Sequence, residues 1–376
     1  MKRKILFLIE NLGDGGAEKV LTTLVQHLDK TKFDVTVCSI CYGGSYENIV
    51  SKVAKHKLLL KSYDSYTGVL KIWYFIKHHL IFKWLPFSWV YNFFIPQNND
   101  VEVAFVEGTT TRLLSASTNK KSKKIAWVHI DLHKFHWTRS VFKSDAEETK
   151  AYNSFDQIVA VSKTAEEAMR KEFRLTVPVR TVYNPIDADE IIRLSQEQID
   201  VPQSNRIRLV SVGRLNKQKA YDRLLRILKR LKGEGLSCEL WLLGEGGDRA
   251  MLEQYIQEND LSEDVKLWGF HNNPYKYLAQ CDLFVCSSIS EGFSTAITEA
   301  LILGLPVVST EVSGVREQLT NGCGLITEND EEALHQGLKS VLDHPERLNE
   351  MREMAIERGR DFRIESLMKE IENVLS

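Results

Sequence analysis

Apolar runs of strand length alternate with helical patterns twice along this chain, and this alternation constrains its fold more than any other feature. In the first half, strand-like runs are expected near residues 4–9, 34–40, 101–106, 124–128 and 157–161. In the second half they are expected near residues 207–212, 238–243, 265–268, 282–286 and 306–309. Such alternation favours parallel sheets with crossover helices. Two series of this kind predict an α/β protein of two doubly wound, Rossmann-like domains facing each other across a cleft.

The boundary between the two domains is expected just after Tyr183. A length of 376 residues suits two domains of ordinary size. A polar stretch follows Tyr183 as far as Asn205, and it is typical of a linker. We therefore expect a first domain over 1–185 and a second over 186–356. Asp187 and Asp189 form a D-x-D, but at the start of a helix aspartates cap rather than bind metal.

Composition excludes several classes of protein. Hydrophobic content of 43% and charged content of 27% describe a soluble globular chain, and a formal net charge of −2 disfavours a nucleic-acid partner. The apolar run after the N-terminal lysines is only five residues long, has no cleavage site and predicts a buried strand rather than a signal peptide. The six cysteines show no secreted pattern, and Cys38 and Cys41 would point to opposite faces of a strand. These features predict a cytoplasmic protein.

A strand, a glycine turn and a helix follow one another between Cys281 and Val308. The apolar run Leu283–Cys286 predicts a buried strand. After a polar loop, Ser294 is placed to cap a helix whose apolar face holds Ala296, Ile297, Ala300 and Leu301, and Gly304 and Pro306 end that helix. A helix N-terminus at the carboxyl end of a strand offers N–H groups and a positive dipole end to a phosphate.

Two carboxylates, Glu291 and Glu299, flank this loop eight positions apart. A carboxylate beside a phosphate site is better suited to hold hydroxyl groups than phosphate. A sugar nucleotide has hydroxyl groups on either side of its diphosphate. The loop therefore predicts a site for a ligand of that kind.

The pattern Glu291-Gly-Phe-Ser-(x)4-Glu299 resembles the E-x7-E signature of retaining glycosyltransferases with the two-domain GT-B architecture, most closely the GT4-type family. The resemblance implies that Glu291 holds the donor sugar and orients its anomeric carbon, while Glu299 holds the ribose. It also implies that the last helix, about 357–376, crosses back to the first domain.

A glycine-rich turn follows the first strand, with the sequence Asn11-Leu-Gly-Asp-Gly-Gly-Ala-Glu18. Glycines let the backbone approach a ligand closely, but the spacing is not G-x-G-x-x-G, so a nicotinamide or flavin cofactor is disfavoured. Gly15 and Gly16 are similar to the GGAE turn of the GT4-type family, which faces the donor. A tight turn that merely needs positive φ is the alternative.

Two cations, Arg214 and Lys219, lie five residues apart after the first strand of the second half. A planar guanidinium and a compact ammonium can hold a diphosphate together. The segment is similar to the family motif G-R-L-x-x-x-K-G, whose cations neutralise the leaving diphosphate. Ala220 departs from that motif, because glycine is usual there.

His129 ends a strand of the first domain, and a histidine there can donate to, or accept from, a substrate hydroxyl. The resemblance places a histidine at this strand end, near the donor sugar. Because Asp131, His133 and His136 follow closely, a zinc site is the alternative.

The resemblance spans almost the whole chain, and it implies a retaining, metal-independent, hexosyltransferase-type enzyme without a cofactor. The residues expected to take part in catalysis are Glu291, His129, Arg214 and Lys219. Those expected to bind substrate are Gly15, Gly16, Gly244, Phe270, Gly292, Phe293, Ser294, Thr295 and Glu299. UDP is the nucleotide expected from the family. The alternatives are a non-catalytic sugar-nucleotide-binding protein and a GT-B epimerase; a phosphorylase would need a much longer chain.

The segment from Val69 to Pro96 is rich in aromatic residues, carries Lys71, Lys77 and Lys83, and has no acidic residue. Charges and a proline interrupt it too often for a transmembrane helix, but the composition suits a membrane interface. A buried helix pair is the alternative. The membrane interpretation predicts a peripheral protein on the inner face of the cytoplasmic membrane, with a polyprenyl-diphosphate-linked glycan as acceptor in polysaccharide assembly.

Overall fold

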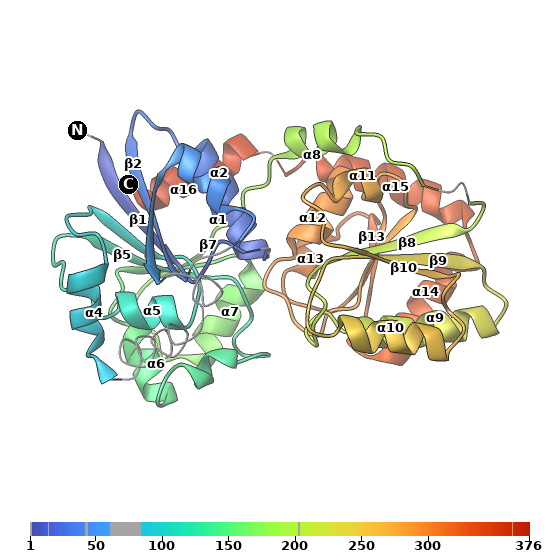
Figure 1. Cartoon of the computed structure of the whole chain (residues 1–376), viewed down its shortest axis with the longest axis horizontal. Coiled ribbons are helices and arrows are strands. Elements are labelled where there is room, and N and C mark those ends of the chain that lie inside the picture. Colours follow the sequence, from blue (N-terminus) through green and yellow to red (C-terminus); the bar gives the residue numbers. More distant parts are fainter. Residues whose placement is uncertain (1, 14, 42–43, 61–83, 202–203, 363) are drawn as a thin grey trace, which may run out of the picture. The chain divides into compact units, whose positions relative to one another are not determined.

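The computed structural model describes residues 2–13, 15–41, 44–60, 84–201, 204–362 and 364–376 (Figure 1). The chain divides into two compact units, of which unit 1 comprises Met1–Pro185 with Glu365–Ser376 and unit 2 comprises Ile186–Ile364. Each unit is built on its own parallel sheet. The predicted α/β class with two doubly wound domains is confirmed.

Unit 1 holds a seven-stranded sheet in the order β3-β2-β1-β4-β5-β6-β7. Its strands are β1 (Arg3–Ile9), β2 (Phe33–Cys41), β3 (Lys55–Leu60), β4 (Val101–Ala104), β5 (Lys123–Val128), β6 (Gln157–Ala160) and β7 (Val179–Thr181). Its helices are α1 (Gly16–His27), α2 (Glu47–Val53), α4 (Phe87–Phe94), α5 (Thr109–Leu114), α6 (Asp145–Tyr152), α7 (Lys163–Glu172), α16 (Ile364–Leu375) and the 3-10 turn η3 (Trp137–Ser140).

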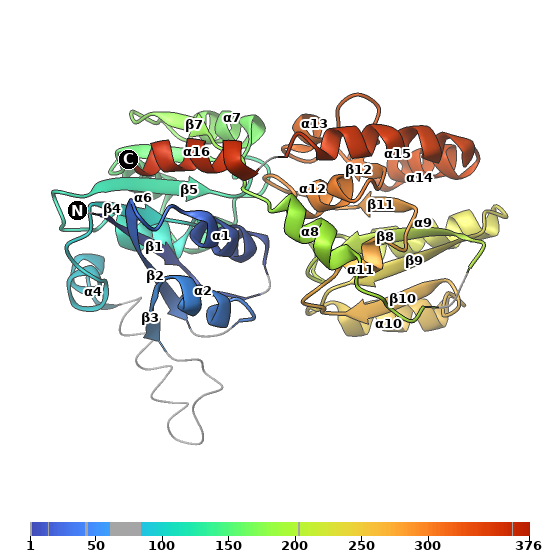
Figure 2. The same ribbon diagram turned by 90° about the horizontal axis from the view of Figure 1, so that it is seen from above.

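The last helix, α16, packs on unit 1, as Figures 1 and 2 show. Met368 and Ile371 are buried on its inner face. Lys123 Nζ, from β5, donates to the Val374 carbonyl at 2.7 Å, and Lys32 Nζ lies 2.9 Å from a Glu372 carboxylate oxygen. The helix begins at Ile364, whereas the returning segment was expected from about residue 357, because the preceding helix continues to residue 359.

Unit 2 holds a six-stranded sheet in the order β10-β9-β8-β11-β12-β13. Its strands are β8 (Ile207–Val212), β9 (Cys238–Leu243), β10 (Val265–Gly269), β11 (Leu283–Cys286), β12 (Val307–Thr310) and β13 (Gly324–Thr327). Its helices are α8 (Ala188–Ser195), α9 (Tyr221–Gly233), α10 (Arg249–Glu258), α11 (Tyr275–Leu278), α12 (Thr295–Ile302), α13 (Val315–Gln318), α14 (Glu331–Leu342) and α15 (Glu346–Gly359).

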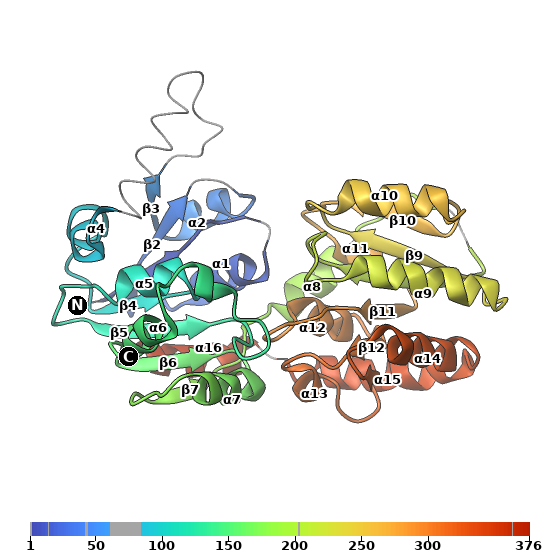
Figure 3. The same cartoon turned by 90° about the horizontal axis from the view of Figure 1, so that it is seen from below.

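Side chains of successive strand residues fill two cores on opposite faces of the unit 2 sheet. Leu209 packs in the core that includes residues of α9, α10 and α14, whereas its neighbour Val210 packs in the core that includes residues of α12 and α15. Figure 3 shows α9 and α12 as separate helices of this unit. A strand buried on both faces is apolar throughout, which explains why continuous apolar runs predicted these strands.

Three strands escaped the sequence analysis. β3 begins with the polar sequence Lys55-His-Lys, β7 has only three residues and β13 is half-buried along its whole length. The expected linker also contains α8, whose N-cap Asp187 accepts a hydrogen bond from the Glu190 N–H at 2.9 Å. The prediction that Asp187 caps a helix is therefore confirmed. No helix in the described residues is long and apolar enough to cross a membrane.

Candidate active site

Ligands of doubly wound folds bind at the carboxyl ends of the parallel strands, so the functional site is expected at that edge of a sheet. In unit 2, β8 and β11 are neighbours in the sheet. The loop after β8 carries Arg214 and Lys219, and the loop after β11 carries Glu291. The topology therefore brings together Lys219 and Glu291, which lie more than seventy positions apart in sequence.

Lys219 and Glu291 form an ion pair at this edge. Lys219 Nζ lies 2.6 Å from Glu291 Oε1, and both side chains are largely buried. Burial disfavours the charge on Lys219, but the charge and hydrogen bond of Glu291, together with Tyr221 and Cys286, outweigh this effect and raise the pKa of Lys219. Lys219 is consequently a cation throughout the physiological pH range. Arg214 is exposed, and its side chain has no hydrogen-bond or ion-pair partner among the described residues.

The loop that carries Glu291 is fixed by hydrogen bonds to its backbone. Thr310 Oγ1 donates to the Ser288 carbonyl at 2.7 Å, and Asn329 Nδ2 donates to the Ile289 carbonyl at 2.9 Å. The buried guanidinium of Arg223, from α9, donates to the carbonyl of Ser287. Because hydrogen bonds from β12, α9 and the segment before α14 meet on one short loop, the backbone that positions Glu291 is firmly held.

The same loop is joined to the segment around Lys219. Ser287 Oγ donates to the Lys219 carbonyl at 2.7 Å, and Gln218 Nε2 donates to the Ser290 carbonyl at 2.8 Å. The Ile289 N–H donates in turn to the Gln218 carbonyl at 2.8 Å. The cation and the carboxylate are thus set by one hydrogen-bonded framework.

Helix α12 begins beside Glu291. Ser294 occupies the N-cap, as predicted, but its side chain makes no capping hydrogen bond, so the expected capping role is wrong. Its carbonyl accepts instead from Gln318 Nε2 at 2.7 Å, which fixes the start of the helix from α13. Because the Ser294 hydroxyl does not occupy the first-turn N–H groups, this end retains the character of an anion site. Glu299 lies on α12, buried to 3% exposure.

Glycines allow the turn after β9 to approach the segment that carries Arg214. A Cβ at Gly244 would overlap the Gly213 carbonyl, and one at Gly246 would overlap the Leu215 carbonyl. The Leu215 N–H donates to the Glu245 carbonyl at 2.9 Å. Only glycine permits this contact, so the G-x-G turn positions the backbone around Arg214. Phe270 follows the next strand and is 38% exposed.

Ala220, the departure from the family motif, adopts the left-handed conformation, with φ 50° and ψ 47°. It immediately precedes α9 and follows Lys219. The left-handed region is unfavourable for a residue with a Cβ and natural for glycine. The structure therefore explains why glycine suits this position, and the alanine stores strain beside the ion pair.

In unit 1, Gly15 and Gly16 form the N-terminus of α1, with Gly15 at the N-cap. A Cβ at Gly15 would overlap the carboxylate of Glu18. The close contact with Glu18 is thus by itself a reason for glycine at this turn, whether or not a ligand binds there.

His129 lies after β5 and is uncharged. Burial lowers the pKa of His129 to about 3, against the opposing effect of a hydrogen bond with the Phe105 backbone. Its Nε2 is buried and has no hydrogen-bond partner among the described residues. A neutral imidazole with an unused ring nitrogen is suited to a hydrogen bond with a hydroxyl group.

Glu107 holds the segment that begins at His129. One carboxylate oxygen accepts from the His129 backbone N–H at 3.1 Å, and the other accepts from Trp137 Nε1 at 3.3 Å. Burial raises the pKa of Glu107, although these hydrogen bonds act in the opposite direction. Glu107 escaped the sequence analysis. Its setting, a Glu-Gly pair after an apolar strand and before a helix, repeats that of Glu291-Gly292 and could have revealed it.

Two of the histidines considered as zinc ligands, His133 and His136, are bound to carboxylates instead. His136 Nε2 lies 2.9 Å from Glu148 and its Nδ1 lies 3.0 Å from Glu172. His133 Nδ1 lies 2.8 Å from the other oxygen of Glu172. Across the described parts of the chain, no group of three or more His, Cys, Asp or Glu residues is arranged to hold a metal.

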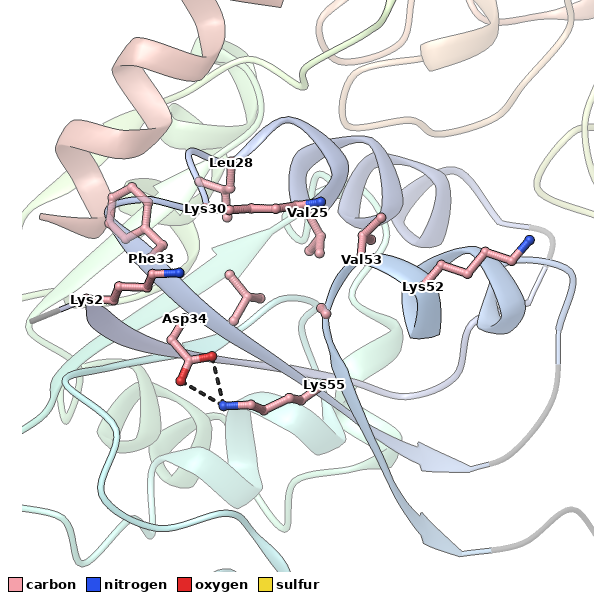
Figure 4. A pocket seen from close by; sticks show the side chains of 11 residues that line it. Lys2, Val25, Leu28, Lys30, Phe33, Asp34, Lys52, Val53 and Lys55 are labelled. Carbon is pink, nitrogen blue, oxygen red and sulfur yellow. Dashed lines mark hydrogen bonds and ion pairs between the residues drawn. The ribbon is translucent and has the colours of Figure 1, made fainter.

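A shallow pocket lies at the opposite, amino-terminal edge of the unit 1 sheet (Figure 4). Lys2, Lys30 and Lys52 contribute to its lining, and Lys55 Nζ bonds both oxygens of Asp34 at 2.9 and 2.7 Å. The ends of α1 and α2 reach this pocket, and lysines there favourably meet the negative ends of helix dipoles. Because this pocket lies at the amino-terminal edge of its sheet, it is separate from the candidate site.

Comparisons with known proteins show the family of the chain. Residues 14–190 match the family model described as Glycosyltransferase Family 4, and residues 194–362 match the one described as Glycosyl transferases group 1. An N-acetylgalactosamine-N,N'-diacetylbacillosaminyl-diphospho-undecaprenol 4-alpha-N-acetylgalactosaminyltransferase of Campylobacter jejuni is 30% identical over 91% of this chain and 90% of its own. The chain belongs to the GT4-type glycosyltransferase family.

Solved structures show the same fold. Anabaena HepE in complex with UDP-glucose matches with a TM-score of 0.76 at 19% identity, over 99% of both chains. Staphylococcus aureus TarM, in a complex that contains UDP, matches with a TM-score of 0.73 at 13% identity, over 100% of both chains. The predicted GT-B fold is confirmed, and the chain is a glycosyltransferase.

Ala220→Gly is expected to stabilise the protein. Left-handed strain costs about 1–2 kcal/mol for a residue with a Cβ. Glycine removes this strain but loses more backbone entropy on folding, so we expect the free energy of unfolding to rise by up to about 1 kcal/mol. Ala333→Gly, within α14, is the control and should destabilise by roughly 0.5–1 kcal/mol. Calorimetric melting should move Tm upward for the first variant and downward for the second. A decrease for both would contradict the strain at Ala220.

His129 is expected to remain neutral from pH 5 to 8. Its pKa of about 3 in the folded state lies below the ordinary value near 6.5, so the unfolded chain binds more protons at low pH. Its contribution to stability is therefore complete above about pH 6.5 and decreases as the pH falls towards 3. The imidazole signal that disappears in His129→Gln should not titrate between pH 5 and 8 by NMR. A midpoint near 6.5 for that signal would overturn this assignment.

Proposed function

We propose that this glycosyltransferase moves a sugar from a UDP-sugar to a lipid-linked glycan with retention of anomeric configuration. The observation that carries the proposal is the contact between Lys219 and Glu291 at 2.6 Å beside the N-terminus of α12. A cation for a diphosphate and a carboxylate for sugar hydroxyls are thereby adjacent. A sugar nucleotide needs both groups at the point where its glycosyl bond breaks.

In this mechanism the bond between the anomeric carbon and the diphosphate oxygen breaks while the acceptor oxygen bonds to that carbon from the same face. Lys219, Arg214 and the N–H groups at the start of α12 would stabilise charge on the leaving diphosphate, which would accept the acceptor's proton. Glu291 would orient the sugar, Glu299 would hold the ribose, and neutral His129 would bind a substrate hydroxyl. The residues of the turn after β9 and Phe270 would adjoin the nucleotide.

Relatives support the choice of donor and acceptor. The Campylobacter jejuni relative is named for a diphospho-undecaprenol acceptor, and HepE binds UDP-glucose. A curated relative of 34% identity over 34% of this chain is an amylovoran biosynthesis glycosyltransferase from Erwinia amylovora. A role in polysaccharide or glycan assembly is consistent with all three.

We also propose peripheral binding to an anionic membrane surface through unit 1. Trp84, Trp89 and Phe93 are 79%, 57% and 77% exposed, and the rings of Trp89 and Phe93 pack edge to face on one side of α4. A hydrogen bond between Thr118 and Asn92 holds the neighbouring loop, with exposed Lys120 and Lys121, beside this helix. Aromatic rings next to lysines suit a membrane interface.

The alternative, a buried helix pair, would require the whole segment to be buried, but only part of its described portion is buried. Val90 and Tyr91 are buried in the core, and the Tyr91 hydroxyl donates to Glu102 at 2.6 Å. Lys71, Lys77, Lys83 and the aromatic residues between them lie outside the described residues.

We call the described surface made by Trp84, Trp89, Phe93, Lys120 and Lys121 the α4 patch.

The first test is transfer itself. Incubation with UDP-sugars and a polyprenyl-diphosphate-linked acceptor should give a product with the donor's anomeric configuration, measured by NMR. Lys219→Ala should lower kcat by roughly 10²–10³, the scale of losing one preorganised stabiliser of developing charge.

Lys217→Ala, which removes an exposed lysine two positions earlier, is the matched control and should retain wild-type kcat. An inverted product would refute retention. Wild-type turnover by Lys219→Ala at saturating donor would refute the role of that lysine in the leaving-group site.

We propose that transfer needs no divalent metal, because Lys219, Arg214 and the α12 N-terminus together supply the positive charge that a metal would provide to the diphosphate. Enzyme freed of metal should keep full activity in EDTA. Activity that is lost in EDTA and restored by Mg²⁺ or Mn²⁺ would show that the protein groups alone are insufficient.

The α4 patch should bind vesicles that contain anionic lipid. Co-sedimentation should be strong at low salt and weaker for Trp89→Ser, Phe93→Ser and Lys120→Glu, because rings and charges both contribute. Met251→Ser, at an exposed apolar position of unit 2, is the control and should bind like wild type. Wild-type protein that ignores anionic vesicles even at low salt would remove the membrane proposal.

A further inference from the structure

Glu291 receives two hydrogen bonds on the same carboxylate oxygen. Ser288 Oγ donates to Oε1 at 2.7 Å, and Lys219 Nζ donates to that oxygen at 2.6 Å. Oε2 has no hydrogen-bond or ion-pair partner among the described residues. The two oxygens of Glu291 are therefore not equivalent, because one is held by the protein and the other remains available to a ligand.

Ser288 is itself buried and held through its backbone. The residue is 2% exposed, and its carbonyl accepts from Thr310 Oγ1 at 2.7 Å and from Asn329 Nδ2 at 3.3 Å. These donors come from β12 and from the segment before α14. A hydroxyl on such a backbone has a fixed position, so it can define the orientation of the carboxylate that it binds.

Lys219 is less suited to that task. Its long side chain has many rotamers, and in the proposed reaction its ammonium group must also serve the diphosphate. An ammonium group has three N–H donors and can contact a phosphate oxygen as well as Glu291. As charge develops on the leaving diphosphate, the ammonium is drawn towards it, whereas the Ser288 hydroxyl stays on Oε1.

We propose that Ser288 is a positioning residue that holds Oε1 of Glu291, so that Oε2 is presented to the hydroxyl groups of the donor sugar. The inference rests on the proposed function, because it assumes that Glu291 contacts the sugar. It implies that Ser288 matters for the sugar and not for the nucleotide. Loss of its hydroxyl should impair steps that depend on sugar orientation and leave the affinity for UDP intact.

Ser288→Ala tests this inference, with Ser290→Ala as its matched control. Both serines are 2% exposed and lie in the same loop, but Ser290 Oγ has no hydrogen-bond partner in the described part of the chain. Ser288→Ala should lower kcat/KM for the donor roughly 10-fold to 100-fold, the scale of one hydrogen bond to a charged group. Ser290→Ala should behave like wild type, and calorimetry should give unchanged UDP binding for both.

Ser288→Cys provides a second variant of nearly the same size. Its thiol is a weaker hydrogen-bond donor, so its kcat/KM should lie between those of Ser288→Ala and wild type. If the alanine variant acted only by leaving a small cavity, Ser288→Cys would instead match wild type, because its thiol fills the space.

Three outcomes would overturn the inference. Wild-type kcat/KM for Ser288→Ala would show that the hydroxyl has no positioning role. An equal loss of UDP affinity and turnover would show that Ser288 merely supports the loop. Glu291→Gln distinguishes these failures from failure of the proposed function, because wild-type turnover by that variant would remove the sugar contact on which both proposals depend.

Discussion

The ion pair between Lys219 and Glu291 is the interaction on which the rest of the site depends. It joins the loops that follow β8 and β11, two neighbouring strands of the unit 2 sheet. Hydrogen bonds between Gln218 or Lys219 and the Ser287–Ser290 loop add to it, so the two loops form one framework. A buried cation and carboxylate are tolerated because each neutralises the other, and removal of one partner would leave the other uncompensated.

Backbone geometry at the strand ends gives this framework its shape. Gly244 and Gly246 let the turn after β9 contact the segment that carries Arg214. Gln318 fixes the start of α12 through the Ser294 carbonyl. The result is a site in which a cation, a carboxylate and a helix N-terminus are set before any ligand binds. Preorganisation of this kind is what electrostatic stabilisation of a leaving group requires.

Much of the fold was predictable because buried parallel strands are apolar throughout and glycine turns follow them. The short or partly polar strands β3, β7 and β13 lack that pattern and were missed. The sequence also indicated roles for Lys219 and Glu291 separately, but not their contact, which depends on β8 lying next to β11. The role of Ser288 depends on a side-chain contact within a folded loop, so no spacing rule could indicate it, whereas the Glu-Gly pair after an apolar strand could have indicated Glu107.

A double-mutant cycle on Lys219 and Glu291 tests the central claim most directly. The measurement is kcat/KM for the donor in wild type, Lys219→Ala, Glu291→Ala and the double variant. If the pair acts as one unit, the double variant should be at least roughly 10-fold more active than the product of the two single effects predicts, as expected for residues in direct contact. Effects that simply multiply would show that the two residues act independently and would contradict the account.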